Sequence, residues 1–254
     1  VFSDHAFAVY PIVTQAVGAR AVSVPAKDWG HDLDAMAAAI TPSTRVVFIA
    51  NPNNPTGTWI ERDALEAFLD RVPENVIVVL DEAYTEYVET DDVPNGVDYL
   101  GRYSNLLVSR TFSKAYGLAA LRVGYGLSHP AIADALNRVR QPFNVNSLAL
   151  AAALAALQDE AYLIESRRIN RIGMQQLEEG CAALGLSWIP SRGNFLAIDL
   201  GREAAPVFQG LLREGVIVRP VANYGMPNYL RVTIGLPVEN QRFLDALKQV
   251  LARV

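Results

Sequence analysis

The sequence has 254 residues, 51% of them hydrophobic and 19% charged, so it can bury a sizeable core in one large or two modest domains. Its formal net charge of -5, without a basic cluster, argues against nucleic-acid and anionic-membrane binding, and no apolar run approaches the roughly 20 residues of a membrane-spanning helix. A single cysteine, Cys181, excludes an intrachain disulfide and, with a start that is no signal peptide, predicts a cytoplasmic protein.

Helices and short apolar strands alternate through the first part of the chain. Hydrophobic periodicity and flanking Gly or Pro predict helices over residues 5–18, 33–40, 61–72 and 130–140. Runs of apolar residues predict strands over residues 22–24, 46–50, 76–80 and 105–109, and a returning strand over residues 122–127. Strands that lack polar alternation are covered on both faces, as in a parallel sheet flanked by helices. The predicted fold class is therefore α/β with a mostly parallel sheet, whose ligand site lies beyond the carboxyl ends of the strands.

A smaller α+β domain is predicted for the second part of the chain. Helices over residues 147–157 and 160–184 lead into it. An antiparallel sheet is expected from three strands, over residues 194–199, 216–219 and 230–234. Two further helices are expected over residues 203–214 and 238–253. We place the large domain at residues 1–150 and the small domain at residues 151–254.

One lysine stands between the predicted strands of the segment NLLVSRTFSKAYGLAALRVGYG, residues 105–126. If Lys114 is buried there, desolvation lowers its pKa toward neutrality, which an amine needs before it attacks an aldehyde to form a Schiff base. Two nearby hydroxyls, of Thr111 and Ser113, and the guanidinium of Arg122 are donors that suit a phosphate. For a Ser-Lys pair considered alone, a surface lysine in a polar loop is the more common alternative.

Three segments in this order carry a family resemblance: ANPNNPTG at residues 50–57, DEAYTEY at residues 81–87, and SRTFSKAYGLAALRVGY around Lys114. They resemble the fold-type I, pyridoxal-phosphate-dependent aminotransferases, and most nearly the histidinol-phosphate aminotransferases among them. The resemblance extends over essentially the whole chain. In that family, Val1 would fall well inside the chain. We therefore expect an N-terminal segment to be missing, with the helix N-terminus that helps bind the cofactor phosphate.

The resemblance implies a binding site for pyridoxal 5'-phosphate at the ends of the strands. Asp81 would keep the pyridine nitrogen protonated, Tyr84 and Asn54 would donate to the phenolic oxygen, and Phe7 would stack on the ring. Lys114 would hold the cofactor and move the substrate proton, with Asp81 and Tyr84 as its catalytic partners. The competing interpretations are a helix cap for Asp81, a turn residue for Asn54 and core packing for Phe7.

Two arginines interrupt predicted apolar strands of the smaller domain, Arg219 in GVIVRPV and Arg231 in YLRVTIG. An unpaired guanidinium in such a strand is costly, so each needs an anion. An internal salt bridge is one possibility. The resemblance implies instead that Arg231 binds the carboxylate or phosphate of a substrate, with Arg219 assisting and Asn54 nearby. The three histidines are scattered without ligand spacing, so no metal is assigned.

By this resemblance, the sequence predicts a transaminase that acts on L-histidinol phosphate and on 2-oxoglutarate or glutamate in histidine biosynthesis. It also predicts a symmetric homodimer with residues 140–147 near the interface. The alternatives within the fold are an aromatic- or aspartate-type aminotransferase and a phosphothreonine-type decarboxylase, which the fold does not distinguish. An alternative from another class is the non-catalytic, effector-binding domain of a transcriptional regulator.

Overall fold

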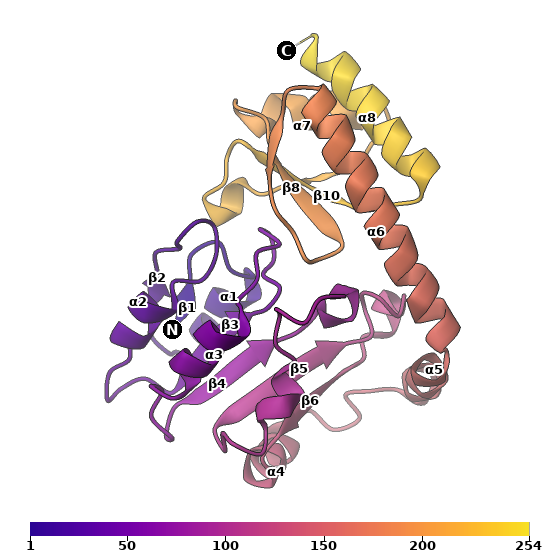
Figure 1. Ribbon diagram of the computed structural model, residues 1–254. Coiled ribbons are helices and arrows are strands. Elements are labelled where there is room, and N and C mark those ends of the chain that lie inside the picture. The colour runs from indigo at the N-terminus through magenta and orange to yellow at the C-terminus, as the bar shows by residue number, and fades with distance from the viewer. Residues whose placement is uncertain (254) are drawn as a thin grey trace.

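Two four-stranded sheets divide the molecule, with strand orders β3-β4-β5-β6 and β7-β8-β10-β9. The computed structural model describes residues 1–253 and places the two sheets in separate lobes (Figure 1). We call the part of the chain around the β3–β6 sheet the first lobe, and the part around the β7–β10 sheet the second lobe. The exact limit between two domains, predicted at residue 150, stays a prediction.

The sheet of the first lobe is mostly parallel, as predicted. Its strands are β3 (Val46–Ala50), β4 (Ile77–Asp81), β5 (Leu106–Thr111) and β6 (Gly124–Ser128), of which only β6 runs antiparallel to its neighbour. A short parallel pair, β1 (Phe2–Ser3) and β2 (Ser23–Val24), lies next to this sheet. Val1 is hydrogen-bonded to the backbone of β3, so β1 separates the predicted strand 22–24 from β3.

Five helices accompany the first sheet, and they bury apolar residues to different extents. These are α1 (Val9–Ala16), α2 (Leu33–Ala38), α3 (Arg62–Leu69), α4 (Pro130–Val139) and α5 (Ser147–Gln158). The number of buried residues ranges from three in α3 to none in α4. In α3, Leu65, Phe68 and Leu69 are buried at the spacing of one helical face. The helix predicted from residue 5 begins only at Val9, because His5 has a left-handed φ of 54° that a helix does not accommodate. The turn before α1 directs Phe7 toward the ends of the strands.

The second lobe contains β7 (Ser187–Ile189), β8 (Phe195–Asp199), α7 (Ala204–Arg213), β9 (Arg219–Pro220), β10 (Tyr229–Thr233) and α8 (Pro237–Leu251). Its sheet is antiparallel, as predicted. The strand predicted over residues 216–219 is wrong in its bounds, since only Arg219–Pro220 pair with β10 at the sheet edge, where proline is tolerated. The short strand β7 was not predicted.

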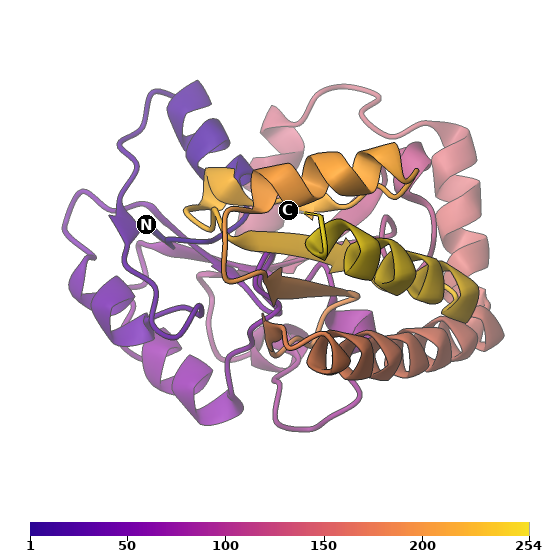
Figure 2. The ribbon, with the colours of Figure 1, turned by 90° about the horizontal axis from the view of Figure 1, so that it is seen from above.

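One long helix, α6 (Glu160–Ala183), runs from the first lobe into the core of the second (Figure 1). There Leu177 and Cys181 are fully buried, and burial raises the pKa of the Cys181 thiol to about 12. Seen from above, α6, α8 and α7 lie side by side over the second sheet (Figure 2). Among residues 1–253, no single helix is long and apolar enough to cross a membrane. Helices α5 and α6 are long and apolar enough only when they are taken together, and they are bent by 77° at their junction.

Candidate active site

A cavity of about 290 Å³ opens at the carboxyl ends of β3, β4 and β5. It is lined by all eight residues for which a cofactor contact was predicted: Phe7, Asn54, Asp81, Tyr84, Thr111, Ser113, Lys114 and Arg122. They come from five separate segments of the chain, and they converge because parallel strands end at the same edge of the sheet. Tyr10, Ser109 and Arg110 also line the cavity and were not predicted.

Asp81 ends β4 and is held by several donors. The hydroxyl of Tyr10 donates to its Oδ2 at 2.8 Å. Burial raises the pKa of Asp81, and hydrogen bonds from Tyr10, the backbone of Ala83 and Ser109, with the charge of Lys114, act in the opposite direction. These donors favour the carboxylate form and so oppose the effect of desolvation on this side chain.

Of the lining residues that were not predicted, Tyr10 makes the direct hydrogen bond to Asp81. It lies 71 positions from Asp81, so no local motif joins the two. The available signal was its spacing from Phe7, because two aromatic residues three positions apart lie on the same side of a helical turn. The Tyr10 ring stacks on Phe48, with centroids 4.7 Å apart, and meets the ring of Phe7 edge to face at 5.9 Å.

Tyr84 and Asn54 both line the cavity, and both are buried. Burial raises the pKa of Tyr84 to about 12, against the effect of the nearby Arg231 charge. The Tyr84 hydroxyl is therefore a donor throughout the neutral range. The Asn54 side-chain oxygen accepts a hydrogen bond from the guanidinium of Arg231, which comes from the second lobe.

Lys114 reaches over the ring of Tyr84, with Nζ 5.4 Å from the ring centroid. The expectation that Lys114 is buried is wrong, because its side chain is exposed at the mouth of the cavity. Lys114 lies in the loop after β5, three residues beyond the end of the strand. Partial desolvation nevertheless lowers the pKa of Lys114, and the charges of Arg231 and Arg122 lower it further. The amine is thus more readily deprotonated than that of a free lysine.

The hydroxyl and guanidinium donors predicted for a phosphate lie along the same rim. The Thr111 hydroxyl accepts the backbone N–H of Ser113 at 3.1 Å, which fixes the turn that follows β5. Arg122 has a left-handed φ of 54° and donates to the carbonyl of Ala119 at 2.7 Å. Its guanidinium is exposed at the cavity rim, with donors left for an anion.

The two arginines of the second lobe occupy facing positions of β9 and β10, since Arg219 pairs with Arg231 in register. Arg231 is half-buried and lies over the ring of Phe195 at 5.0 Å. Arg219 is exposed, so the expectation that it is embedded in an apolar strand is wrong; β9 is an edge strand that leaves it in solvent. Among residues 1–253, neither arginine forms a salt bridge, which is evidence against an internal ion pair.

The second lobe is in direct contact with the loop that carries Asn54. The backbone N–H of Arg192 donates to the carbonyl of Gly57 at 2.9 Å, and a Cβ at Gly57 would overlap the side chain of Ser191. Gly57 also has a φ of 82°, which other residues rarely adopt. The Arg192 guanidinium lies 4.5 Å above the ring of Trp59. Arg231 of the same lobe reaches the cavity lining through its hydrogen bond to Asn54.

A larger cleft of about 1080 Å³ lies between α2, α3 and β7. It contains none of the predicted site residues, although it is lined by all three tryptophans of the chain, Trp29, Trp59 and Trp188. The convergence of ionisable and hydrogen-bonding groups therefore points to the smaller cavity as the candidate active site.

Comparisons with known proteins agree with this arrangement. Residues 1–247 match the family described as aminotransferase class I and II. The chain belongs to this family. A curated relative, histidinol-phosphate aminotransferase 2 of Pseudomonas fluorescens, is 76% identical over 253 residues, which are 100% of this chain and 68% of the relative. Another of the same name, from Pseudomonas aeruginosa, is 72% identical over 99% of this chain and 68% of its own length.

Solved structures give the same assignment for the fold of this aminotransferase-family chain. A histidinol-phosphate aminotransferase from Sinorhizobium meliloti, crystallised with pyridoxal-5'-phosphate, superposes with a TM-score of 0.92 at 33% identity. The alignment covers 100% of this chain and 70% of that one. The predicted resemblance and the predicted α/β fold class are thereby confirmed.

Proposed function

We propose that this aminotransferase transfers the amino group of L-histidinol phosphate to 2-oxoglutarate, with pyridoxal 5'-phosphate as cofactor, in histidine biosynthesis. The observation that carries the proposal is the 76% identity, over the whole chain, to a relative named histidinol-phosphate aminotransferase. The cavity supports it because its lining residues supply each group that such a reaction needs.

The donor set of the cavity fits the cofactor. Phe7 offers an aromatic face, Asp81 a half-buried carboxylate for the pyridine nitrogen, and Tyr84 and Asn54 donors for the phenolic oxygen. The hydroxyls of Thr111 and Ser113 and the guanidinium of Arg122 would bind the phosphate. When bound, the cofactor supplies an electron sink that acidifies the C–H bond of the substrate.

Lys114 would attach the cofactor and then serve as the general base that moves the proton of the reacting carbon. Its Nζ is suited to this task because its pKa is lowered by desolvation, Arg231 and Arg122. A base is most effective when its pKa lies near the working pH. Tyr84 and Asp81 would orient the cofactor, while the contact of the second lobe with Gly57 would limit the access of water.

Arg231 would bind the anionic group of either substrate, the phosphate of histidinol phosphate or a carboxylate of glutamate. Its position on Asn54 and over Phe195 directs the guanidinium toward the cavity. Arg219 would assist from the exposed edge strand, where a doubly charged phosphate gains more from a second guanidinium than a carboxylate does.

The test is a panel of amino donors assayed against 2-oxoglutarate. We expect histidinol phosphate to have the highest kcat/KM. The variant Arg231→Ala should lower that kcat/KM about tenfold to a hundredfold, since loss of a charge-assisted hydrogen bond costs about 1.5 to 3 kcal/mol. Arg219→Ala should affect histidinol phosphate more than glutamate, and Arg213→Ala, on the outer surface of α7, is the control. A faster reaction with phenylalanine or aspartate would refute the proposed substrate.

The attachment of the cofactor to Lys114 can be tested separately from turnover. Borohydride reduction followed by peptide mass spectrometry should find the adduct on Lys114. An adduct on another lysine, or decarboxylation of phosphothreonine without transamination, would assign the chain a different role in the same fold. If cofactor binds through Lys114 and no donor reacts, the effector-binding interpretation replaces the enzymatic one.

We also propose that the chain forms a symmetric homodimer through residues 140–147 and the adjoining face of α5. Phe143 is 97% exposed, and Leu148 and Leu154 of α5 are exposed by 76% and 62%. Large apolar side chains that are this exposed on neighbouring segments are candidates for burial between subunits. Light scattering should give a dimer mass at micromolar concentration, and Phe143→Asp should shift it toward the monomer. A fully active monomer would contradict the proposal.

The cytoplasmic location stays a prediction, for which the free, buried thiol of Cys181 is the supporting observation.

A further inference from the structure

A second carboxylate, Glu82, directly follows Asp81 and is fully buried. Its Oε2 accepts hydrogen bonds from Nε and Nη2 of Arg110, at 2.9 and 2.7 Å. Its Oε1 accepts the backbone N–H of Gly96 at 2.6 Å. Arg110 also donates to the side-chain oxygen of Asn95 at 2.7 Å. Both carboxylate oxygens are thus satisfied, and we call Glu82, Arg110, Asn95 and Gly96 the inner cluster.

The ion pair joins two strands at the point where their ladder ends. Asp81 of β4 pairs in register with Ser109 of β5, and the N–H of Glu82 donates to the carbonyl of Ser109 at 2.9 Å. Arg110 is the next residue of β5. Beyond the pair, one strand leads to Tyr84 and the other to Lys114. The Glu82–Arg110 pair therefore links the strands between Asp81 and the later site residues Tyr84 and Lys114.

Ser109 connects this link to the cavity, which it lines, and it pairs in register with Asp81. Its side chain is among the groups that lower the pKa of Asp81 against the effect of desolvation. The Asp81–Ser109 contact and the Glu82–Arg110 pair come from successive residues of the same two strands. Successive side chains along a strand alternate between its two faces. A shift of β5 relative to β4 would change the distance between Ser109 and Asp81 and the position of the Lys114 loop together.

The surroundings of the pair leave little room for adjustment. A Cβ at Gly96 would lie 2.8 Å from Oε1 of Glu82 and 2.6 Å from Cδ2 of Leu80, so only glycine fits there. A buried ion pair loses much of its attraction to desolvation, and apolar replacements of both partners are often as stable. Stability alone is therefore a weak reason to keep two charges at this place.

We propose that Glu82 and Arg110 form a positioning pair, which holds β4 and β5 in register so that Asp81 and Lys114 keep their geometry in the transamination reaction. The inference rests on the function proposed above. Neither residue of the pair needs to touch the substrate, because the pair acts through Asp81 and its contact with Ser109.

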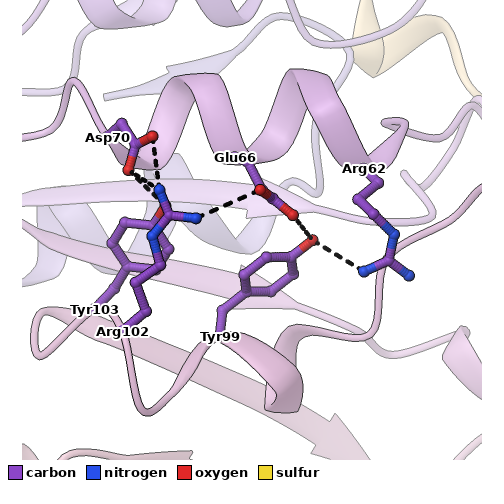
Figure 3. Close-up of polar contacts among 6 residues, drawn as sticks. All are labelled: Arg62, Glu66, Asp70, Tyr99, Arg102 and Tyr103. Carbon is purple, nitrogen blue, oxygen red and sulfur yellow. Dashed lines mark hydrogen bonds and ion pairs between the residues drawn. The ribbon is translucent and has the colours of Figure 1, made fainter.

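The test compares Glu82→Gln with Glu82→Asp in the holoenzyme. Glu82→Gln removes the charge that Arg110 binds, and we expect kcat to fall about tenfold or more while KM changes less than about threefold. Glu82→Asp keeps the charge and should recover part of the loss. The pH midpoint of the visible absorbance of the Lys114-linked cofactor should shift in Glu82→Gln, a signal that does not depend on turnover. The matched control is Asp70→Asn, which breaks the exposed Arg102–Asp70 pair of the same lobe (Figure 3).

A positioning role through Asp81 also predicts non-additivity. Once Asp81→Asn has been introduced, Glu82→Gln should have little further effect on kcat. If Glu82→Gln lowers only the melting temperature and leaves both kcat and the absorbance midpoint unchanged, the pair is a structural link and the proposal is overturned. If Glu82→Gln does not fold, Arg110→Lys carries the same expectations. Failure of the proposed function would appear separately, as a wild-type protein without a cofactor adduct on Lys114 or without donor turnover.

Discussion

The two ends of the short helix η2 (Gly96–Tyr99) are held by ionic clusters of opposite character. At Gly96 stands the inner cluster, built on Glu82 and Arg110. At Tyr99 stands an outer cluster, which joins α3 to the segment before β5 (Figure 3). Its members are Arg62, Glu66, Asp70, Tyr99, Arg102 and Tyr103.

The shortest ion pairs of the two clusters have the same length, and their solvent exposure differs. Arg110 and Glu82 approach to 2.7 Å, as do Arg102 and Asp70. The side chains of the first pair are 16% and 1% exposed, those of the second 53% and 51%. Water screens the outer pair and leaves it worth about 0–1 kcal/mol. Removing one partner of the inner pair leaves a buried charge, which costs about 3–5 kcal/mol. Burial, and not the distance between the charged atoms, therefore distinguishes the inner cluster, which positions the site residues, from the outer cluster on the surface.

The largest effect is expected at Asp81, the half-buried carboxylate beside the inner cluster. Asp81→Asn should leave the cofactor bound and reduce kcat by about a thousandfold or more, because the pyridine nitrogen loses its anionic partner. Steady-state kinetics with histidinol phosphate and the visible absorbance of the bound cofactor measure the two effects. Turnover within tenfold of the wild type would show that a neutral side chain suffices there.

A third carboxylate next to the inner cluster, that of Glu86, predicts a pH-dependent stability. The side chain is 7% exposed, and burial raises its pKa from 4.5 to about 7, with Glu82 adding to the shift and Arg110 and Arg167 opposing it. Since the folded state holds a proton that the unfolded state has lost between pH 4.5 and 7, the free energy of unfolding falls as the pH rises through that window.

Glu86→Gln stays neutral and should escape this loss. Relative to the wild type, it should be more stable at pH 8 by at most about 3 kcal/mol, since one pKa unit corresponds to 1.36 kcal/mol, and equally stable near pH 4. Urea denaturation at the two pH values gives the difference. A constant offset across the range would mean that the ionisation of Glu86 does not contribute.

Gly96→Ala disturbs the inner cluster sterically and leaves every charge in place. The added methyl group meets Glu82, Leu80 and Val108 within 3 Å. Overpacking of this kind costs about 1–3 kcal/mol, and we expect a matching fall in the free energy of unfolding together with a lower kcat. Gly101→Ala is the control, because a Cβ at Gly101 meets no atom within 4 Å. Equal behaviour of the two variants would mean that the inner cluster adapts freely.

The outer cluster should give the smallest effect. Arg102→Ala removes its contacts with Glu66 and Asp70 and is expected to cost less than about 1 kcal/mol, and less still in high salt. Turnover should not change. Thermal unfolding at low and high ionic strength is the measurement, and a loss of activity would place the outer cluster in the same class as the inner one.

The sequence was sufficient to predict which side chains meet at the cavity, because Asn54, Asp81 and Lys114 follow strands whose parallel arrangement brings their ends together. It was insufficient to predict the solvent exposure of individual side chains. Lys114 and Arg219 were expected to be buried and are exposed. Whether a residue is buried depends on how its loop lies relative to the sheet and on which strand forms the edge of the sheet. Tyr10 was missed because its contact with Asp81 spans 71 positions, and only the packed structure joins them.

The cleft between α2, α3 and β7 gives the molecule an optical property. Trp29 and Trp59 line it from the first lobe and Trp188 from the second, and the chain has no other tryptophan. All three indoles are half-buried. The emission of an indole changes with the polarity around it, so a movement that opens or closes the cleft should change the tryptophan emission, to which no tryptophan outside the cleft contributes. Rearrangement of the lobes can therefore be followed in solution without a label.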